Sequence, residues 1–205
     1  MLSELAVATG NIDKIREIKE RLVGVVGVIH WLEDYPDFVL PPETGKTLRE
    51  NASIKARALW QVSRVPTLAD DTGLFVDALQ GRPGVFSGRY AGPDATYQEN
   101  LALLLAEMKG VPVGKRQARF LTELCCIWSG GVHYLSGSCP GEILTAPQAA
   151  AGAFGYDPIF QPDGCLSPFS RMSVTEKNRI SHRGLALEAL HGWLLAGNIK
   201  ESDND

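Results

Sequence analysis

The most constraining feature of the sequence is a pair of carboxylates inside an apolar stretch, Leu68-Ala69-Asp70-Asp71-Thr72-Gly73-Leu74-Phe75-Val76-Asp77. Apolar runs of strand-like length flank the two acids, and a hydroxyl and a glycine follow them directly. Side chains alternate along a regular strand, so Asp70 and Asp71 should point to opposite sides. We expect one of them to face an active cleft and the other to tie down backbone.

Two other interpretations of this stretch compete with a catalytic strand. Asp, Thr and Gly are common turn residues, so Asp70 to Thr72 could form a polar turn between two strands. A phosphatase with an aspartyl nucleophile is disfavoured, because its D-x-D-x-T/V pattern needs an acid where Gly73 stands.

Length and charge limit the function classes. With 205 residues, of which 44% are hydrophobic and 21% charged, the chain is predicted to form a single domain over 1–205, with room for two lobes. The net charge of −4 provides no overall basic field for a nucleic-acid backbone or an anionic membrane. A small-molecule ligand is therefore favoured, with no nucleic acid and no membrane as partners.

Cysteine spacing and the N-terminus predict a cytoplasmic protein. The four cysteines, Cys125, Cys126, Cys139 and Cys165, lack C-x-x-C spacing, which favours reduced core thiols. The first residues lack a basic segment, and the apolar run ends at Gly10, too early for a signal peptide or membrane span.

The N-terminal segment has the pattern of an anion site. Leu5 to Ala8 should form a buried strand, Thr9-Gly10-Asn11 a tight loop, and Ile15, Ile18 and Leu22 one face of a following helix. Such a loop can present backbone N–H groups and a positive dipole end to a phosphate. Lys14 would stand unfavourably in the first helical turn unless an anion lies nearby.

A second helix should begin at a capping box, with Thr47 at the N-cap and Glu50 at N3, and run to about Val62. A strand is expected before it, over Val25 to Ile29. Glu43 lies in the loop between them and has no local structural role, so it either reaches a cleft or is a solvated loop acid.

The middle of the chain predicts a long loop, a helix and a hairpin. The segment from Gln80 to Pro93 is rich in Gly and Pro and longer than a simple connector. A helix from about Thr96 to Met108 follows, and its apolar stripe is expected in the core. Ser129-Gly130-Gly131 then separates two strand-like runs, Gln117 to Trp128 and Val132 to Leu144.

The last third concentrates aromatic and basic residues. Gly152-Ala153-Phe154-Gly155-Tyr156-Asp157-Pro158 offers an aromatic face and a carboxylate, which suits a planar ring. A capping box at Ser173 and Glu176 predicts a helix start, and a final helix is expected from about Gly184 to Leu195. Lys177, His182 and Arg183 are concentrated around these predicted helix starts, where cations are unfavourable, which favours an anionic ligand over a solvated face.

Together these segments closely resemble the inosine/xanthosine triphosphate pyrophosphatases, from about residue 5 to residue 195. The motifs are Thr9-Gly10-Asn11-x-x-Lys14, Glu50-Asn51-Ala52, Ala69-Asp70-Asp71-Thr72-Gly73-Leu74, Pro83-Gly84-Val85-x-Ser87, Phe154-Gly155-Tyr156-Asp157-Pro158 and Ile180-Ser181-His182-Arg183-Gly184. The resemblance implies an α/β fold with a long mixed central β-sheet, flanking helices and two lobes around a nucleotide cleft, usually assembled as a homodimer. It also implies Mg²⁺-dependent hydrolysis of ITP, dITP and XTP to the monophosphate and pyrophosphate, which clears damaged purines from the nucleotide pool.

The resemblance also implies residue roles. The loop from Thr9 through Gly10 and Asn11 to Lys14 would hold the triphosphate together with Lys177, and Thr72 would touch the substrate. Asp71 would be general base or metal ligand. Phe154, Gly155, Tyr156 and Asp157 would form the base pocket with His182 and Arg183. Two positions depart from the family pattern: Ala153 replaces a usual glycine, and Pro42 stands where many relatives carry the metal-binding glutamate, so Glu43 is taken as the second Mg²⁺ ligand.

Hydrogen-bond polarity adds a prediction about base choice. Arg183 would donate to the purine O6, and Asp157 would accept from N1–H, which adenine cannot satisfy. The alternatives from other classes are a non-catalytic nucleotide sensor and a pyrophosphatase acting on pyrimidine triphosphates.

Overall fold

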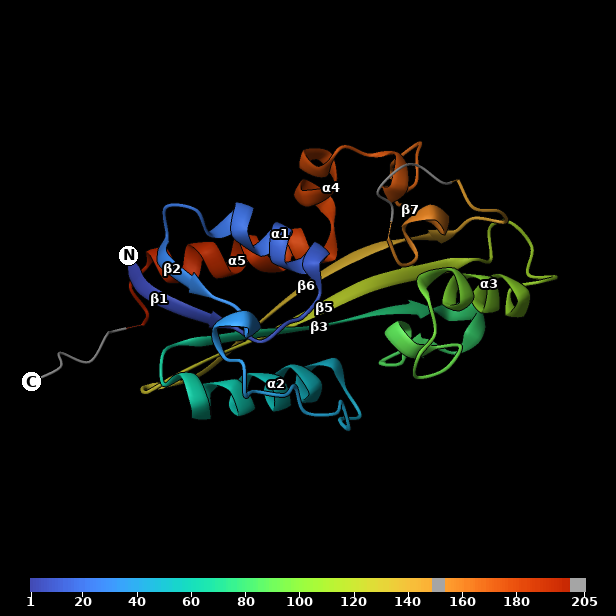
Figure 1. Ribbon diagram of the computed structural model, residues 1–205. Coiled ribbons are helices and arrows are strands. Elements are labelled where there is room, and N and C mark those ends of the chain that lie inside the picture. The colour runs from blue at the N-terminus through green and yellow to red at the C-terminus, as the bar shows by residue number, and fades with distance from the viewer. Residues whose placement is uncertain (149–153, 200–205) are drawn as a thin grey trace, which may run out of the picture. The chain divides into compact units, whose positions relative to one another are not determined.

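The structure is a computed structural model that describes residues 1–148 and 154–199. Those residues form an open, mixed β-sheet with flanking helices, which confirms the predicted fold class (Figure 1). The strands are β1 (Leu2–Val7), β2 (Val26–His30), β3 (Thr67–Val76), β4 (Pro83–Gly84), β5 (Gln117–Trp128), β6 (Gly131–Ile143) and β7 (Phe160–Pro162). The helices are α1 (Ile12–Leu22), α2 (Leu48–Ser63), α3 (Tyr97–Glu107), α4 (Val174–Ile180) and α5 (His182–Leu195). The sheet order is β2-β1-β3-β5-β6-β7, and β4 pairs with β3.

The chain divides into two compact units, each built from separate segments. Unit 1 comprises residues 1–71, 122–137 and 183–205, and unit 2 comprises residues 72–121 and 138–182. Strands β3, β5 and β6 contribute residues to both units. The prediction that 1–205 forms one domain stays a prediction.

In unit 1, β1 pairs in parallel with β2 and β3. Helices α1 and α5 cover one face of these strands and α2 covers the other (Figure 1). Alternation along β1 produces both interfaces, because Leu5 and Val7 pack with α1 and α5 whereas Ala6 and Ala8 pack with α2. Many of the side chains packed on the second face are small, among them Ala52 and Ala56 of α2.

Strand β3 runs without interruption through the paired acids, so the alternative of a polar turn there is wrong. The alternation seen in β1 continues, since Leu68 belongs to the core under α1 and α5 and Ala69 to the core under α2. Gly73 is required by a close approach, because a Cβ at this position would lie 2.5 Å from the Gly84 carbonyl oxygen. The glycine therefore lets β4 pair with β3.

Unit 2 has its own core, rich in aromatic residues. Phe120 packs edge-on against Phe160, with ring centroids 4.7 Å apart, and Phe169 lies 5.2 Å from Phe160. The predicted long loop from Gln80 to Pro93 is partly ordered, since it contains β4 and a 3-10 turn over Ser87–Arg89. Neighbouring strands β5 and β6 are joined by two residues, as predicted for a hairpin.

Three details of the helices differ from the sequence prediction. Thr47 caps α2, but the Glu50 carboxylate accepts from the Lys46 N–H, so the predicted capping box is only half formed. Helix α5 begins at His182, two residues before the predicted start. Lys177 lies in the last turn of α4, where a cation is favourable, so the prediction of an unfavourable position is wrong for this lysine.

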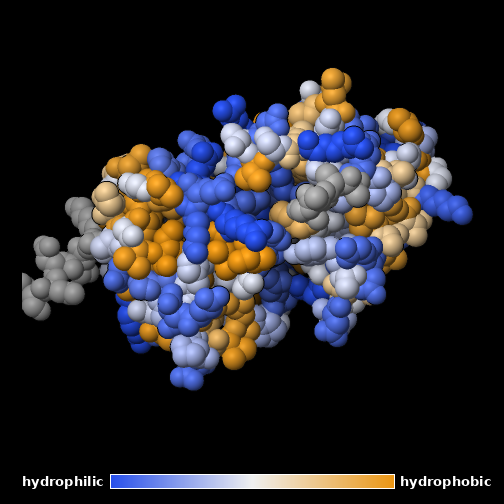
Figure 2. Space-filling model, turned by 45° about the horizontal axis from the view of Figure 1, so that its top comes forward, coloured by the Kyte–Doolittle hydropathy of each residue, from blue (hydrophilic) through white to orange (hydrophobic). Residues whose placement is uncertain are grey.

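The remaining sequence expectations concern thiols, surface and membrane. Cys125, Cys126 and Cys139 are buried and Cys165 partly so, and all four are free thiols, as predicted. On the face shown in Figure 2, hydrophilic residues are interspersed with apolar ones. Among the described residues, no helix is long and apolar enough to cross a membrane. Gly152 and Ala153 lie outside the described residues.

Candidate active site

Asp70 is the centre of a buried ionic network on the α1 and α5 face of β3. Its Oδ2 lies 2.8 Å from Lys14 Nζ and 3.4 Å from Arg183 Nε, and Arg183 also pairs with Glu17 of α1. Burial acts to raise the pKa of Asp70, but Lys14 and Arg183 together hold that pKa well below its ordinary value. The network therefore joins two carboxylates and two basic side chains.

Asp71 points to the opposite face, toward α2, as the strand period predicted. Its Oδ2 accepts a hydrogen bond from Asn51 Nδ2 at 3.1 Å, and its Oδ1 lies 3.3 Å from Lys55 Nζ. The same ammonium donates to Glu43 Oε1 at 2.8 Å. Burial raises the pKa of Asp71 and Glu43 adds to that rise, while Lys55 opposes it.

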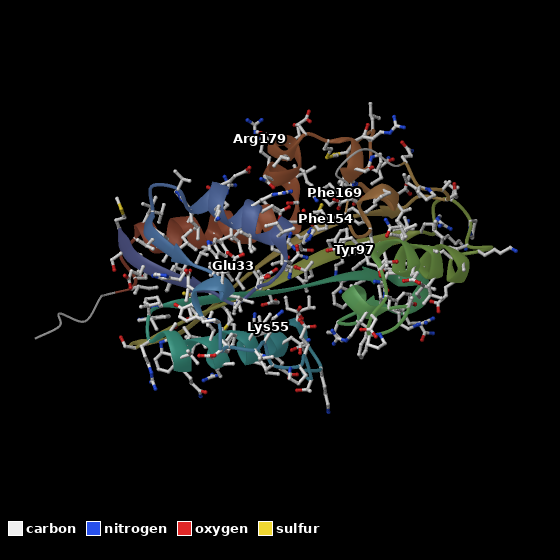
Figure 3. All side chains as sticks on the ribbon, in the orientation of Figure 1. Glu33, Lys55, Tyr97, Phe154, Phe169 and Arg179 are labelled. Atoms are coloured by element: carbon white, nitrogen blue, oxygen red, sulfur yellow. The ribbon has the colours of Figure 1, made fainter. Side chains whose placement is uncertain are left out.

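Helix α2 delivers both Asn51 and Lys55 because they stand one turn apart on its core-facing side, beside Ala52 and Ala56. Figure 3 shows Lys55 rising from α2 toward β3. Sequence reasoning missed Lys55 as a site residue. The signal was available, because a lysine at a core-facing position of an amphipathic helix needs a buried anion.

The loop from Thr9 to Lys14 has the predicted strand–loop–helix form. Asn11 caps α1, and its Oδ1 accepts from the N–H groups of Asp13 and Lys14 at 2.9 and 3.3 Å. The Thr9 hydroxyl oxygen accepts from the Asn11 N–H at 3.2 Å. Two first-turn amides thus already bond to the cap, and the charge of Lys14 becomes the main attraction that this segment offers to an anion.

A second cluster of predicted residues lies in unit 2. Lys177 Nζ donates to Asp157 Oδ2 at 2.6 Å and lies 4.3 Å from the centroid of the Phe154 ring. The rings of Tyr97 and Phe154 are 6.1 Å apart, and Figure 3 shows Phe154, Phe169 and Tyr97 near one another. An ammonium, a carboxylate and an aromatic ring are thereby combined in one place.

The other unit 2 residues have structural contacts that the sequence did not reveal. The buried Tyr156 hydroxyl donates to the Ser87 carbonyl at 2.9 Å and so ties Tyr156 to the segment from Gln80 to Pro93. Gly155 has a φ of +57°, which favours glycine. His182 stacks on Phe120 with centroids 4.5 Å apart, and Thr72 is half-buried beside Asp71 on β3.

The structure gives two basic residues ion-pair partners that the sequence did not reveal. Arg183 was expected with the base pocket, but its ion pairs are with Asp70 and Glu17 in unit 1. Lys177 was expected beside the triphosphate loop, but it pairs with Asp157 in unit 2. Asp157 is therefore an acceptor that already has a cationic partner, and the predicted role of Arg183 in reading the base stays a prediction.

Comparisons with known proteins show the family of the chain. The sequence model of the Ham1 family matches residues 5–193. The chain is 42% identical to a dITP/XTP pyrophosphatase of Geobacter sulfurreducens, over 94% of this chain and 98% of that protein, and 43% identical to one of Lactobacillus acidophilus, over 93% and 96%. A solved HAM1 protein of Coxiella burnetii has a TM-score of 0.86 and 35% identity, covering 96% of this chain and all of that one. The chain therefore belongs to the Ham1 family.

Proposed function

We propose that this protein is a Mg²⁺-dependent pyrophosphatase that hydrolyses dITP, ITP and XTP to the nucleoside monophosphate and pyrophosphate. Its Ham1 membership and the names of its relatives support hydrolysis of non-standard purine triphosphates. The observation that carries the proposal is the placement of Asp71 and Glu43 on one buried ammonium, with the Lys14 network on the other face of the same strand.

The unit 1 cations suit the polyphosphate chain. Lys14 is joined to Asp70, and Lys55 to Asp71 and Glu43, so each ammonium is fixed by carboxylates before any ligand arrives. Fixed cations stabilise the charge that develops on a departing pyrophosphate without having to reorganise. The loop residues Thr9, Gly10 and Asn11 are proposed to bind the triphosphate next to Lys14.

The carboxylates fit Mg²⁺, which prefers carboxylate and phosphate oxygens and keeps several waters. Asp71 and Glu43 are both within hydrogen-bond or ion-pair distance of one cation, so their oxygens converge on the same place. Bound there, the ion would neutralise phosphate oxygens. Asp71 would either hold the ion or take a proton from the attacking water on a carboxylate oxygen, and each role requires its negative charge.

The unit 2 cluster suits the purine. The Phe154 ring offers a stacking surface, the Lys177 ammonium a donor for O6, and Asp157 an acceptor for N1–H. The combination of Arg183 and Asp157 predicted from the sequence remains the alternative to this pair. Gly155 and Tyr156 shape the same loop, His182 is proposed to complete the pocket, Thr72 to touch the substrate, and Arg183 to act on the phosphate side through Asp70.

Three further parts of the proposal extend the sequence predictions. A single two-lobed domain over 1–205 follows from chain length, a cytoplasmic location from the cysteines and the N-terminus, and assembly as a homodimer from the family resemblance.

The test is a panel of nucleoside triphosphates with Mg²⁺, with pyrophosphate and orthophosphate measured separately. ITP, dITP and XTP should each yield one pyrophosphate and one monophosphate per molecule, faster than ATP, GTP or the pyrimidine triphosphates. Release of mainly orthophosphate and IDP from ITP would overturn the reaction, and tight ITP binding without turnover would indicate a sensor. Preference for a pyrimidine would overturn the substrate class.

A further inference from the structure

Lys55 lies where a metal ion would be expected. Its Nζ is 2.8 Å from Glu43 Oε1 and 3.3 Å from Asp71 Oδ1, and only 8% of its side chain is exposed. The Asp71 side chain is similarly buried, at 9% exposure, while that of Glu43 is more open, at 27%. The ammonium thus bridges the two carboxylates that the proposed function assigns to Mg²⁺.

The charges explain why a cation is needed there. Two carboxylates close together in a poorly solvated place repel each other, and a cation between them removes most of that cost. Lys55 is fixed between these acids by its two short contacts with their carboxylate oxygens. Lys55 therefore supplies the positive charge that these two carboxylates need when no metal ion is bound.

A divalent ion that enters without a counter-anion would meet this ammonium. Among the residues that the structure describes, no group of three or more His, Cys, Asp or Glu side chains could hold a metal, so protein ligands alone are few. Two carboxylates, one ammonium and one divalent ion together carry a charge of +1, which is unfavourable in a buried site. A polyphosphate would supply both the missing oxygen ligands and the missing negative charge.

We propose that Lys55 is a built-in counter-ion that occupies the cation position between Glu43 and Asp71, so that Mg²⁺ binds weakly by itself and tightly only together with an anionic polyphosphate. This inference rests on the proposed function for the identity of the metal ligands. Lys55 is accordingly a positioning residue for the metal site and a barrier to metal uptake in the nucleotide-free protein.

The first experiment measures Mg²⁺ binding by calorimetry in nucleotide-free protein at pH 8. Lys55→Gln should bind Mg²⁺ about tenfold or more tightly than the wild type, because the competing unit charge is gone. Arg57→Gln is the matched control, since it removes an exposed cation from the same helix and should leave Mg²⁺ affinity unchanged. Equal affinity of Lys55→Gln and the wild type, or no measurable binding to either, would overturn the proposal.

The second experiment measures thermal stability and uses no enzymatic activity. Without metal, Lys55→Gln should melt at least roughly 4 °C below the wild type, and millimolar Mg²⁺ should recover most of that loss. The double variant Glu43→Gln/Lys55→Gln removes one acid with the lysine, so its metal-free melting temperature should return toward that of the wild type. If the double variant melts lower than Lys55→Gln, or if Mg²⁺ restores nothing, Lys55 is not a counter-ion.

These outcomes are separate from those of the substrate panel. If the wild type releases pyrophosphate as proposed but Lys55→Gln has unchanged Mg²⁺ affinity, only the counter-ion role is refuted. If Lys55→Gln binds Mg²⁺ more tightly but the wild type hydrolyses no triphosphate, the proposed reaction is refuted. The competition between Lys55 and Mg²⁺ is then still supported.

Discussion

Asp70→Asn provides the sharpest test of the buried ionic network, because the substitution keeps shape and removes one charge. In the wild type Asp70 lies 2.8 Å from Lys14 and 3.4 Å from Arg183, and both cations are largely buried. Breaking a buried pair in this way costs about 3–5 kcal/mol, since the partners remain buried without their counter-charge. For a chain of this size that loss corresponds to a melting temperature lower by about 6–20 °C.

The assay is thermal unfolding by calorimetry without ligand, with Asp13→Asn as the control. Asp13 pairs at 3.7 Å with Arg16, whose side chain is 71% exposed, so its loss should cost less than about 1 kcal/mol. The reasoning would be refuted if Asp70→Asn melted within about 2 °C of the wild type at pH 7. That result would mean that the network contributes no net stability.

The pH dependence of this difference has a defined sign. The pKa of Asp70 is lower in the folded protein than in the unfolded chain, where it is near its ordinary value. The stability that this depression provides is therefore complete above about pH 4 and declines as the pH falls below it. The gap in melting temperature between wild type and Asp70→Asn should narrow on acidification from pH 6 toward pH 3.

Three further predictions concern catalysis, the unit 2 cluster and the thiols. Asp71→Asn should lower kcat by about 100-fold or more while the fold is kept, because the amide can neither bind Mg²⁺ strongly nor accept a proton; near-normal pyrophosphate release by the folded variant would contradict this. Lys177→Met should destabilise the ligand-free protein by about 3 kcal/mol, since Asp157 would lose its buried partner, and an unchanged melting curve would argue against it. Burial raises the pKa of Cys126 and Cys139 to about 12, so both should resist iodoacetamide at pH 8.5 until the protein unfolds, as mass spectrometry of their peptides can check.

Local rules predicted much of the fold and of the candidate site, and the errors have physical causes. The period of two along a strand placed Asp70 and Asp71 on opposite faces, and the Asn11 cap and Lys14 were readable from a short segment. The partners of Arg183 and Lys177 were not, because ion pairs with Glu17 and Asp157 join residues far apart in sequence. No local sequence pattern indicates whether Lys177 or Arg183 pairs with a given acid elsewhere in the chain.

A similar limit explains the mistaken position of Lys177. The capping box at Ser173 was recognised, but α4 is only seven residues long, so a lysine near its start is also in its last turn. Lys55 was overlooked because a lysine in a helix is usually solvated. Only the apolar residues around it on α2, Ala52 and Ala56, indicate that it faces the core.

The alternation of the two units along the chain has a consequence for how the protein can be divided. Unit 1 is assembled from three stretches of sequence and unit 2 from two, and β3, β5 and β6 belong in part to each. No single cleavage separates them, and a truncated gene product that ends after residue 121 would contain only part of either core. Neither unit corresponds to one continuous stretch of sequence, so a gene fusion that carried one unit alone would have to join several separate segments.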